Sequence, residues 1–271
     1  MSQGTLSGRS ILITQGKSKS TKMRRLLEEQ GARVIEIPLI EIRPLESPQL
    51  EQAIEKIPSY HWIAFSSANG VRIFADQAAR SGEWPPAADG PRLAVVGPGT
   101  EAALKQSGAR ADLVARLHQA EGLLEDLEER HPESLQGVRI LLPLAALARP
   151  FLAGELKKEG AEVDAVPVYD TVPAQSNRPK LNQFLNDDRP DLITLASSSA
   201  ARNLVDLCDD LPLLRRLNCV AIGPVTARSA RQCGLCVALV AETSSLSGMI
   251  EAIETYFRMP RQDAKGARLQ E

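Results

Sequence analysis

Two strand-to-helix turns of the same type are placed where an anion can bind. They read GPGT at residues 97–100 and GPVT at residues 223–226, and each ends an aliphatic run and opens a helical pattern. The first N–H groups of a helix lack carbonyl partners, and the helix dipole favours negative charge beside them. The candidate ligand contacts in these turns are Gly97, Thr100, Gly223 and Thr226. Ordinary helix capping is the alternative explanation.

Hydroxyl and amide groups gather at the ends of two further predicted strands, in SSANG (residues 66–70) and SSS (residues 197–199). Such a neutral, donor-rich surface suits carboxylates that are held without full ion pairing. The candidate contacts here are Ser67, Asn69, Ser197 and Ser199. A nucleophilic serine is not indicated, because no serine lies in a GxSxG turn and none of the three histidines has a suggestive placement.

Tyr169 and Arg149 complete the candidate set. Tyr169 is one of only three tyrosines, and it occupies the segment VPVYDTVP where the other half of the chain has Ile40. A phenol is protonated at neutral pH and can donate a proton, although packing is the alternative role. Arg149 begins a predicted helix and would supply a counter-charge to a polyacid.

A long internal repeat organises these residues. The segment Leu12 to Pro44 matches Leu141 to Pro173, 129 positions later, and the two GP turns match each other 126 positions apart. Each unit is too large for a solenoid repeat. We therefore expect two similar domains that face each other across a cleft.

The elements between these motifs predict an α/β fold. Each half contains five short aliphatic or β-branched runs, and each run is followed by helical periodicity, which specifies parallel sheets covered by helices. Five strands per half suggest the flavodoxin-like order, with ligands at the carboxyl ends of the strands. The Pro-bounded segments 37–44 and 166–173 are predicted connectors between the domains. In the first helix, Ser20 or Thr21 is the predicted N-cap and Gly31 the predicted stop.

Composition excludes several classes of function. The 271 residues include 43% hydrophobic and 24% charged residues, and the net charge of −2 argues against nucleic acid as a partner. No apolar run is long enough to cross a membrane and no export signal is visible, so we expect a cytoplasmic protein. We also expect a monomer. The pair Cys233 and Cys236 has redox or zinc spacing, but it follows a helix and no second ligand pair accompanies it, so we predict inert thiols and no metal.

Taken in order, the motifs FSSANGV, AVVGPGT, AEGLLEDL, ILLP, GAEVDAVPVYDT and AIGPVTA resemble the uroporphyrinogen-III synthase family over residues 9–257. The resemblance implies two flavodoxin-like domains joined by a two-stranded connector that the chain crosses twice. The first domain would comprise residues 1–39 and 172–271, and the second residues 40–171.

The same resemblance implies the reaction. The substrate would be hydroxymethylbilane, a linear tetrapyrrole with eight carboxylates, which is closed to uroporphyrinogen III with inversion of ring D and loss of water, without a cofactor. Tyr169 matches the tyrosine proposed to assist departure of the hydroxyl group. The hydroxyl-bearing and turn residues above match positions that line the cleft, and Thr14 ends the first strand, where substrate contacts are expected.

Two departures from the family pattern affect the expected contacts. Gln15 replaces an arginine that commonly follows Thr14, and Lys17 or Arg24 could substitute for it. Ala196 begins a loop that usually reads Thr-Ser-Pro-Ser. These departures leave open a tetrapyrrole-binding relative without catalysis. A two-lobed small-molecule binding protein, which also has paired α/β lobes and crossing connectors, is a further alternative, although the absence of an export signal counts against it.

Overall fold

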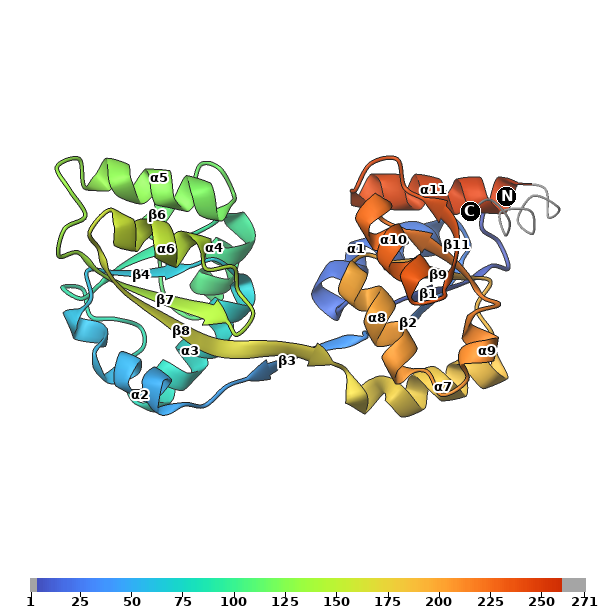
Figure 1. Cartoon of the computed structure of the whole chain (residues 1–271), viewed down its shortest axis with the longest axis horizontal. Coiled ribbons are helices and arrows are strands. Elements are labelled where there is room, and N and C mark those ends of the chain that lie inside the picture. Colours follow the sequence, from blue (N-terminus) through green and yellow to red (C-terminus); the bar gives the residue numbers. More distant parts are fainter. Residues whose placement is uncertain (1–3, 260–271) are drawn as a thin grey trace. The chain divides into compact units, whose positions relative to one another are not determined.

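The computed structural model of the chain describes residues 4–259, apart from the side chains of residues 17–19 (Figure 1). Contacts between residues divide the chain into two compact units. Unit 1 comprises the residues up to Glu41 and those from Val172 onward, and unit 2 comprises Ile42–Thr171. Both crossings lie inside strands, namely β3 (Ile40–Pro44) and β8 (Glu162–Pro173).

Unit 1 is built on a five-stranded sheet with the strand order β11-β10-β9-β1-β2. Its strands are β1 (Ser10–Ile13), β2 (Arg33–Glu36), β9 (Leu192–Leu195), β10 (Asn218–Ala221) and β11 (Cys236–Val240). Every neighbouring pair in this sheet is parallel. The helices are α1 (Lys17–Glu29), η2 (Gln175–Asn177), α7 (Arg178–Asp187), α8 (Ser198–Leu207), α9 (Leu211–Leu214), α10 (Pro224–Gln232) and α11 (Leu246–Arg258).

Strand alternation buries both faces of this sheet. Ile11 and Ile13 of β1 pack with α1 and α11, while Leu12 between them packs with α7 to α10. Both helical layers contribute fully buried leucine, isoleucine or methionine side chains. The result is the α/β sandwich with a parallel sheet that the alternating sequence pattern predicts.

Unit 2 contains a six-stranded sheet with the strand order β3-β8-β7-β4-β5-β6. Its further strands are β4 (Trp62–Phe65), β5 (Arg92–Val95), β6 (Leu113–Val114) and β7 (Arg139–Ala145), which pair in parallel with one another and with β8. The helices are α2 (Pro48–Glu55), η1 (Ile57–Ser59), α3 (Ala68–Arg80), α4 (Pro98–Gln106), α5 (Ala120–Arg130) and α6 (Phe151–Lys158). Helices α2 to α4 cover one face, and α5 and α6 cover the other (Figure 1).

The start of α1 and the extent of β8 differ from the sequence predictions, whereas the end of α1 agrees with them. Helix α1 begins at Lys17, before either predicted N-cap, because the Ser20 N–H already donates to the Gly16 carbonyl at 3.2 Å. Gly31 ends that helix with a φ of 87°, as predicted. Segment 166–173 is continuous with β8, so the predicted strand and connector form a single 12-residue strand. No helix among residues 4–259 is long and apolar enough to cross a membrane.

Candidate functional site

The structure pairs two of the predicted site residues in unit 2. Ser67 is the N-cap of α3, and its Oγ accepts a hydrogen bond from the Gly70 N–H at 3.0 Å. The Tyr169 hydroxyl lies 3.1 Å from the same Oγ. Tyr169 is only 7% exposed, so packing from the core fixes the position of its ring while its hydroxyl reaches the end of β4. The phenol is therefore held at a helix N-terminus by a capping serine.

Unit 1 repeats the cap without the phenol. Ser197 is the N-cap of α8, and its Oγ accepts from the Ala200 N–H at 3.1 Å and lies 2.9 Å from Ser199 Oγ. Ile40 is the counterpart of Tyr169 in the repeat, and it lines a pocket that also contains Ser197. The two strand ends thus share a hydroxyl cap, with the phenol of Tyr169 beside it in unit 2 and the hydroxyl of Ser199 beside it in unit 1.

The glycines of the GP turns lie close to side chains of a neighbouring loop. Both Gly97 and Gly223 have extended backbones, which any residue can adopt. A Cβ at Gly97 would lie 3.2 Å from the side chain of His118, and a Cβ at Gly223 would lie 2.4 Å from Ser244 Oγ. In each unit, therefore, the loop after an edge strand, β6 or β11, packs directly on the GP turn.

The threonines of these turns are buried. Thr100 and Thr226 occupy the third position of α4 and α10, and the two residues are 5% and 6% exposed. The Thr100 N–H donates to the Gly97 carbonyl at 3.0 Å. Proline at the first helical position has no N–H. Within the described residues this leaves the Gly99 N–H of α4, and the Val225 and Thr226 N–H groups of α10, as donors for a ligand.

Thr14 is also buried, and its hydroxyl bonds to a neighbouring strand. Its hydroxyl donates to the Thr194 carbonyl at 2.7 Å, and the residue is 2% exposed, so it links β1 to β9. Arg24, the expected substitute for an arginine at position 15, forms ion pairs with Glu28 and Glu36. The side chain of Lys17 lies outside the described part of the chain.

Each unit has a pocket at the carboxyl ends of its strands, and the two occupy equivalent positions in the repeat. The unit 1 pocket has a volume of about 360 Å³. It is lined by Thr14, Gln15, Gly16, Met23, Ile40, Ala196, Ser197, Ala200, Ile222, Ser244, Ser245, Leu246 and Met249. The unit 2 pocket has a volume of about 340 Å³. It is lined by Ser66, Val96, His118, Gln119, Ala120, Leu144, Ala148, Arg149, Phe151, Leu152 and Ala153.

Arg149 lies in the unit 2 pocket, in the loop two residues before α6 rather than in the first turn of that helix. The same pocket contains His118, which the sequence analysis dismissed. Asn69 lies apart from it, and its Oδ1 accepts from Arg72 at 3.4 Å.

His118 and Ser244 are equivalent in the repeat. His118 follows β6 and Ser244 follows β11, and each of these strands is an edge strand of its sheet. That equivalence is the signal that could have identified them. Among the described residues no cluster of three His, Cys, Asp or Glu side chains is arranged to hold a metal ion, and all four cysteines are free thiols.

A comparison with protein-family models matches residues 21–251 to the family described as uroporphyrinogen-III synthase HemD. This chain belongs to the uroporphyrinogen-III synthase family. The family assignment places the chain in porphyrin biosynthesis.

Curated relatives agree with the assignment. The uroporphyrinogen-III synthase of Synechococcus elongatus is 31% identical over 269 residues, which cover 95% of this chain and 99% of that protein. The porphyrin biosynthesis protein HemD of Ruminiclostridium josui is 30% identical over 92% of this chain. The present chain spans 48% of the length of that protein.

Two solved synthase structures share the α/β fold. A mutant uroporphyrinogen III synthase from Thermus thermophilus has a TM-score of 0.53 at 19% identity, with 93% of this chain and 99% of that chain covered. The enzyme from Helicobacter pylori has a TM-score of 0.51 at 16% identity, with 91% and 99% covered. At these identities the likeness concerns the fold alone.

Proposed function

We propose that this chain is a uroporphyrinogen-III synthase that converts hydroxymethylbilane to uroporphyrinogen III with loss of water. The observation that carries the proposal is the Tyr169 hydroxyl, 3.1 Å from the capping Ser67 at a strand end, in a chain of this family. The phenol would donate a hydrogen bond or a proton to the departing hydroxyl group of the substrate. Ser67 would orient it.

The strand-end residues of both units would hold the carboxylates. Ser67 and Asn69 in unit 2 correspond to Ser197 and Ser199 in unit 1, and each set lies at a helix N-terminus that favours an anion. The GP turns would add the backbone N–H groups of Gly99 and Val225. Arg149 would supply a full positive charge, while the buried Thr14, Thr100 and Thr226 would shape the wall beneath the ligand.

Steering is the demanding part of the reaction. Departure of the hydroxyl group leaves an electrophilic azafulvene, and unguided attack by the nearest free α-carbon of the last ring would give the non-inverted isomer. A bound chain held so that the substituted α-carbon attacks would pass through a spiro intermediate that fragments and recloses. Orientation by fixed donors can supply several kcal/mol of such a preference, so no single side chain has to carry the selectivity.

The proposal includes the architecture that presents these residues. Numbered within unit 1, the strand order is 2-1-3-4-5, which is the flavodoxin-like arrangement, with ligands expected at the carboxyl ends. We infer the same arrangement for the five parallel strands of unit 2, and a connector made of β3 and β8. A monomeric state and a cytoplasmic location stay predictions from the sequence.

Incubation with freshly prepared hydroxymethylbilane, followed by oxidation and chromatographic separation of isomers I and III, tests the function. We expect isomer III to predominate with the protein and isomer I without it. If the isomer ratio equals that of the buffer control, the chain is not a synthase. Binding of the tetrapyrrole without any change in that ratio would instead indicate the non-catalytic relative.

A further inference from the structure

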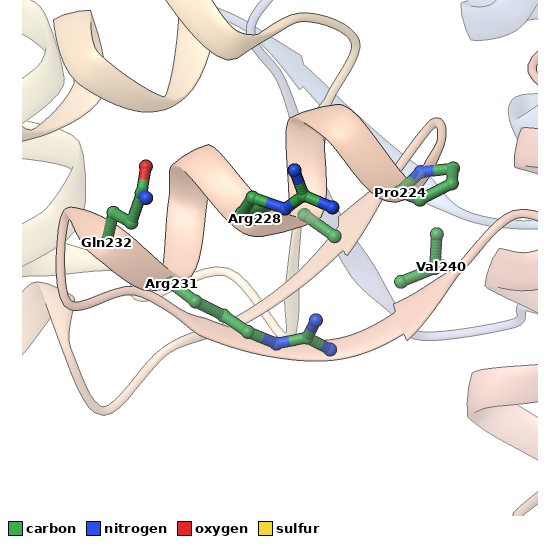
Figure 2. Close-up of a pocket in the computed structure, with 6 residues that line it drawn as sticks. Pro224, Arg228, Arg231, Gln232 and Val240 are labelled. Carbon is green, nitrogen blue, oxygen red and sulfur yellow. The ribbon is translucent and has the colours of Figure 1, made fainter. Parts of the chain in front are cut away.

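A groove outside the predicted site has a volume of about 630 Å³, larger than either strand-end pocket. It runs between helix α10 and strand β11, which is an edge strand of the unit 1 sheet (Figure 2). Its lining is Pro224, Ala227, Arg228, Arg231, Gln232 and Val240. The floor is therefore apolar and two guanidinium groups border it.

The charges of this groove are not neutralised within the described part of the chain. Arg228 and Arg231 lie three residues apart on one face of α10 and form no ion pair there, and the helix contains no acidic residue. By contrast, Arg80 pairs with Asp76 and Arg258 pairs with Glu254, each four residues away in the same helix. Neighbouring like charges repel, so this pair favours an added anion.

The two units differ in the charges of this helix. In α4, the counterpart of α10, Lys105 forms an ion pair with Glu101 at 2.6 Å. Arg231 is the counterpart of Lys105, but the position of Glu101 is taken by Ala227 in the groove floor. Replacing the carboxylate by a methyl group removes the internal partner of the cation and leaves space above the alanine.

The groove extends along α10 as far as the GP turn at the start of that helix. Figure 2 shows the side chains of Arg228 and Arg231 extending toward Pro224 and Val240, as side chains on a helix do when they point back to its N-terminus. Pro224 begins α10 directly after Gly223 of the GP turn, and Val240 is the last residue of β11. Both cations therefore face the carboxyl edge of the sheet.

We propose that Arg228 and Arg231 form a carboxylate subsite that binds acidic side chains of the tetrapyrrole in the groove between α10 and β11. The proposal rests on the proposed function. Guanidinium groups bind carboxylates in a bidentate geometry, and the apolar floor at Ala227 and Val240 suits the methylene groups that carry them. The subsite exists in unit 1 alone, because Glu101 already occupies Lys105 in the other unit.

Steady-state kinetics with hydroxymethylbilane test the subsite. We expect R228A and R231A each to raise KM by about fivefold, as for one exposed charge-assisted contact, and the double variant to raise it by about 20-fold. The rise in KM should exceed any fall in kcat. R216A is the matched control, because Arg216 is an exposed arginine of the same unit that precedes β10, at the amino ends of the strands.

Equilibrium binding separates the subsite from catalysis. Uroporphyrin III, with eight carboxylates, and coproporphyrin III, with four, serve as stable probes in a fluorescence titration. We expect the wild-type protein and R216A to prefer the eight-carboxylate probe, and the double variant to lose most of that preference. Wild-type KM and wild-type preference in the double variant would overturn the subsite. A wild-type protein that forms no isomer III would instead overturn the proposed function.

Discussion

The Tyr169 hydroxyl is fixed by Ser67 on one side and by the core around its ring, so its removal should affect one chemical step. We predict that Tyr169→Phe lowers kcat by about 10²-fold, in the range of a lost general acid, and changes KM by less than about twofold. Steady-state formation of isomer III, corrected for spontaneous closure, measures both constants. Unchanged kcat would remove Tyr169 from the mechanism.

Tyr60→Phe provides the matched control for that variant. The Tyr60 hydroxyl donates to Asp164 at 2.5 Å, and burial together with this bond raises the pKa of the phenol. Tyr60 precedes β4, at the amino end of the strand whose carboxyl end leads to Ser67. Its substitution should lower stability without lowering kcat.

His131 gives unit 2 a dependence of stability on pH. The Trp62 Nε1–H donates to His131 Nε2 at 2.9 Å, which requires a neutral ring, and burial, followed by the nearby Arg92, lowers the pKa of His131. As pH falls through about 6.5, His131 binds a proton in the unfolded chain but stays neutral in the folded protein. The free energy of unfolding therefore decreases until the pH reaches the lowered pKa of the folded state.

Urea unfolding at about pH 7.5 and pH 5.5 tests this dependence against His131→Gln, which keeps an acceptor but does not titrate. The wild-type protein should lose more stability than the variant over that interval. An equal loss in both proteins would show that His131 does not contribute.

At the scale of single residues, a break in the repeat drew attention to Tyr169, but its contact with Ser67 could not be predicted from the sequence. The burial of Thr14 and Thr100 could not be predicted either, since a residue type does not reveal whether a hydroxyl faces solvent or a neighbouring carbonyl. His118 was missed because only the packing of its loop on Gly97 brings it to the pocket.

Helices α5 and α11 begin against the loops that pack on the GP turns. A Cβ at Gly122 of α5 or at Gly248 of α11 would lie 2.3 Å from the backbone oxygen of Leu117 or Thr243, respectively. Alanine usually stabilises a helix interior by about 1 kcal/mol over glycine. Here we predict the opposite sign, a loss of about 1–3 kcal/mol in Gly248→Ala, because backbone atoms would have to move.

Gly154→Ala is the control for that prediction. Gly154 lies within α6, and a Cβ there would meet no atom within 4 Å, so the ordinary gain of about 0.5–1 kcal/mol should appear. Urea unfolding of both variants measures the difference. A stabilised Gly248→Ala protein would contradict the close packing of the loop on α11.

Most of the strands were predictable, because parallel strands buried on both faces appear as short aliphatic runs between helical segments. The start of α1 was not, since Gly16 caps it without any side-chain hydrogen bond and so leaves no sequence signal. The continuity of β8 through Pro167 as far as Pro173 was also missed, because proline ordinarily suggests the end of a strand.

At the scale of the whole molecule, each sheet contains strands from both sequence repeats. Strands β1 and β2 come from the first repeat but join β9 to β11 of the second, while β7 and β8 of the second repeat join β4 to β6 of the first. The sequence repeat alone would assign each half to its own domain. The discontinuous assignment came from the family resemblance.

Unit 2 is continuous in sequence, and both of its core clusters consist of residues from the range Ile42–Thr171. We therefore predict that the fragment 42–171 folds by itself with a cooperative urea transition and a helical circular dichroism spectrum. A fragment that gives a random-coil spectrum would contradict the independence of this unit.

The proposed function requires polar strand ends to bind the polyacid and thereby direct ring closure. A crystal structure with uroporphyrinogen III bound tests this requirement most directly. We predict product carboxylates within about 3.2 Å of donors at the strand ends that carry Ser67 and Gly99 or Ser197 and Val225. Product bound away from the carboxyl ends of the strands would contradict the proposed function.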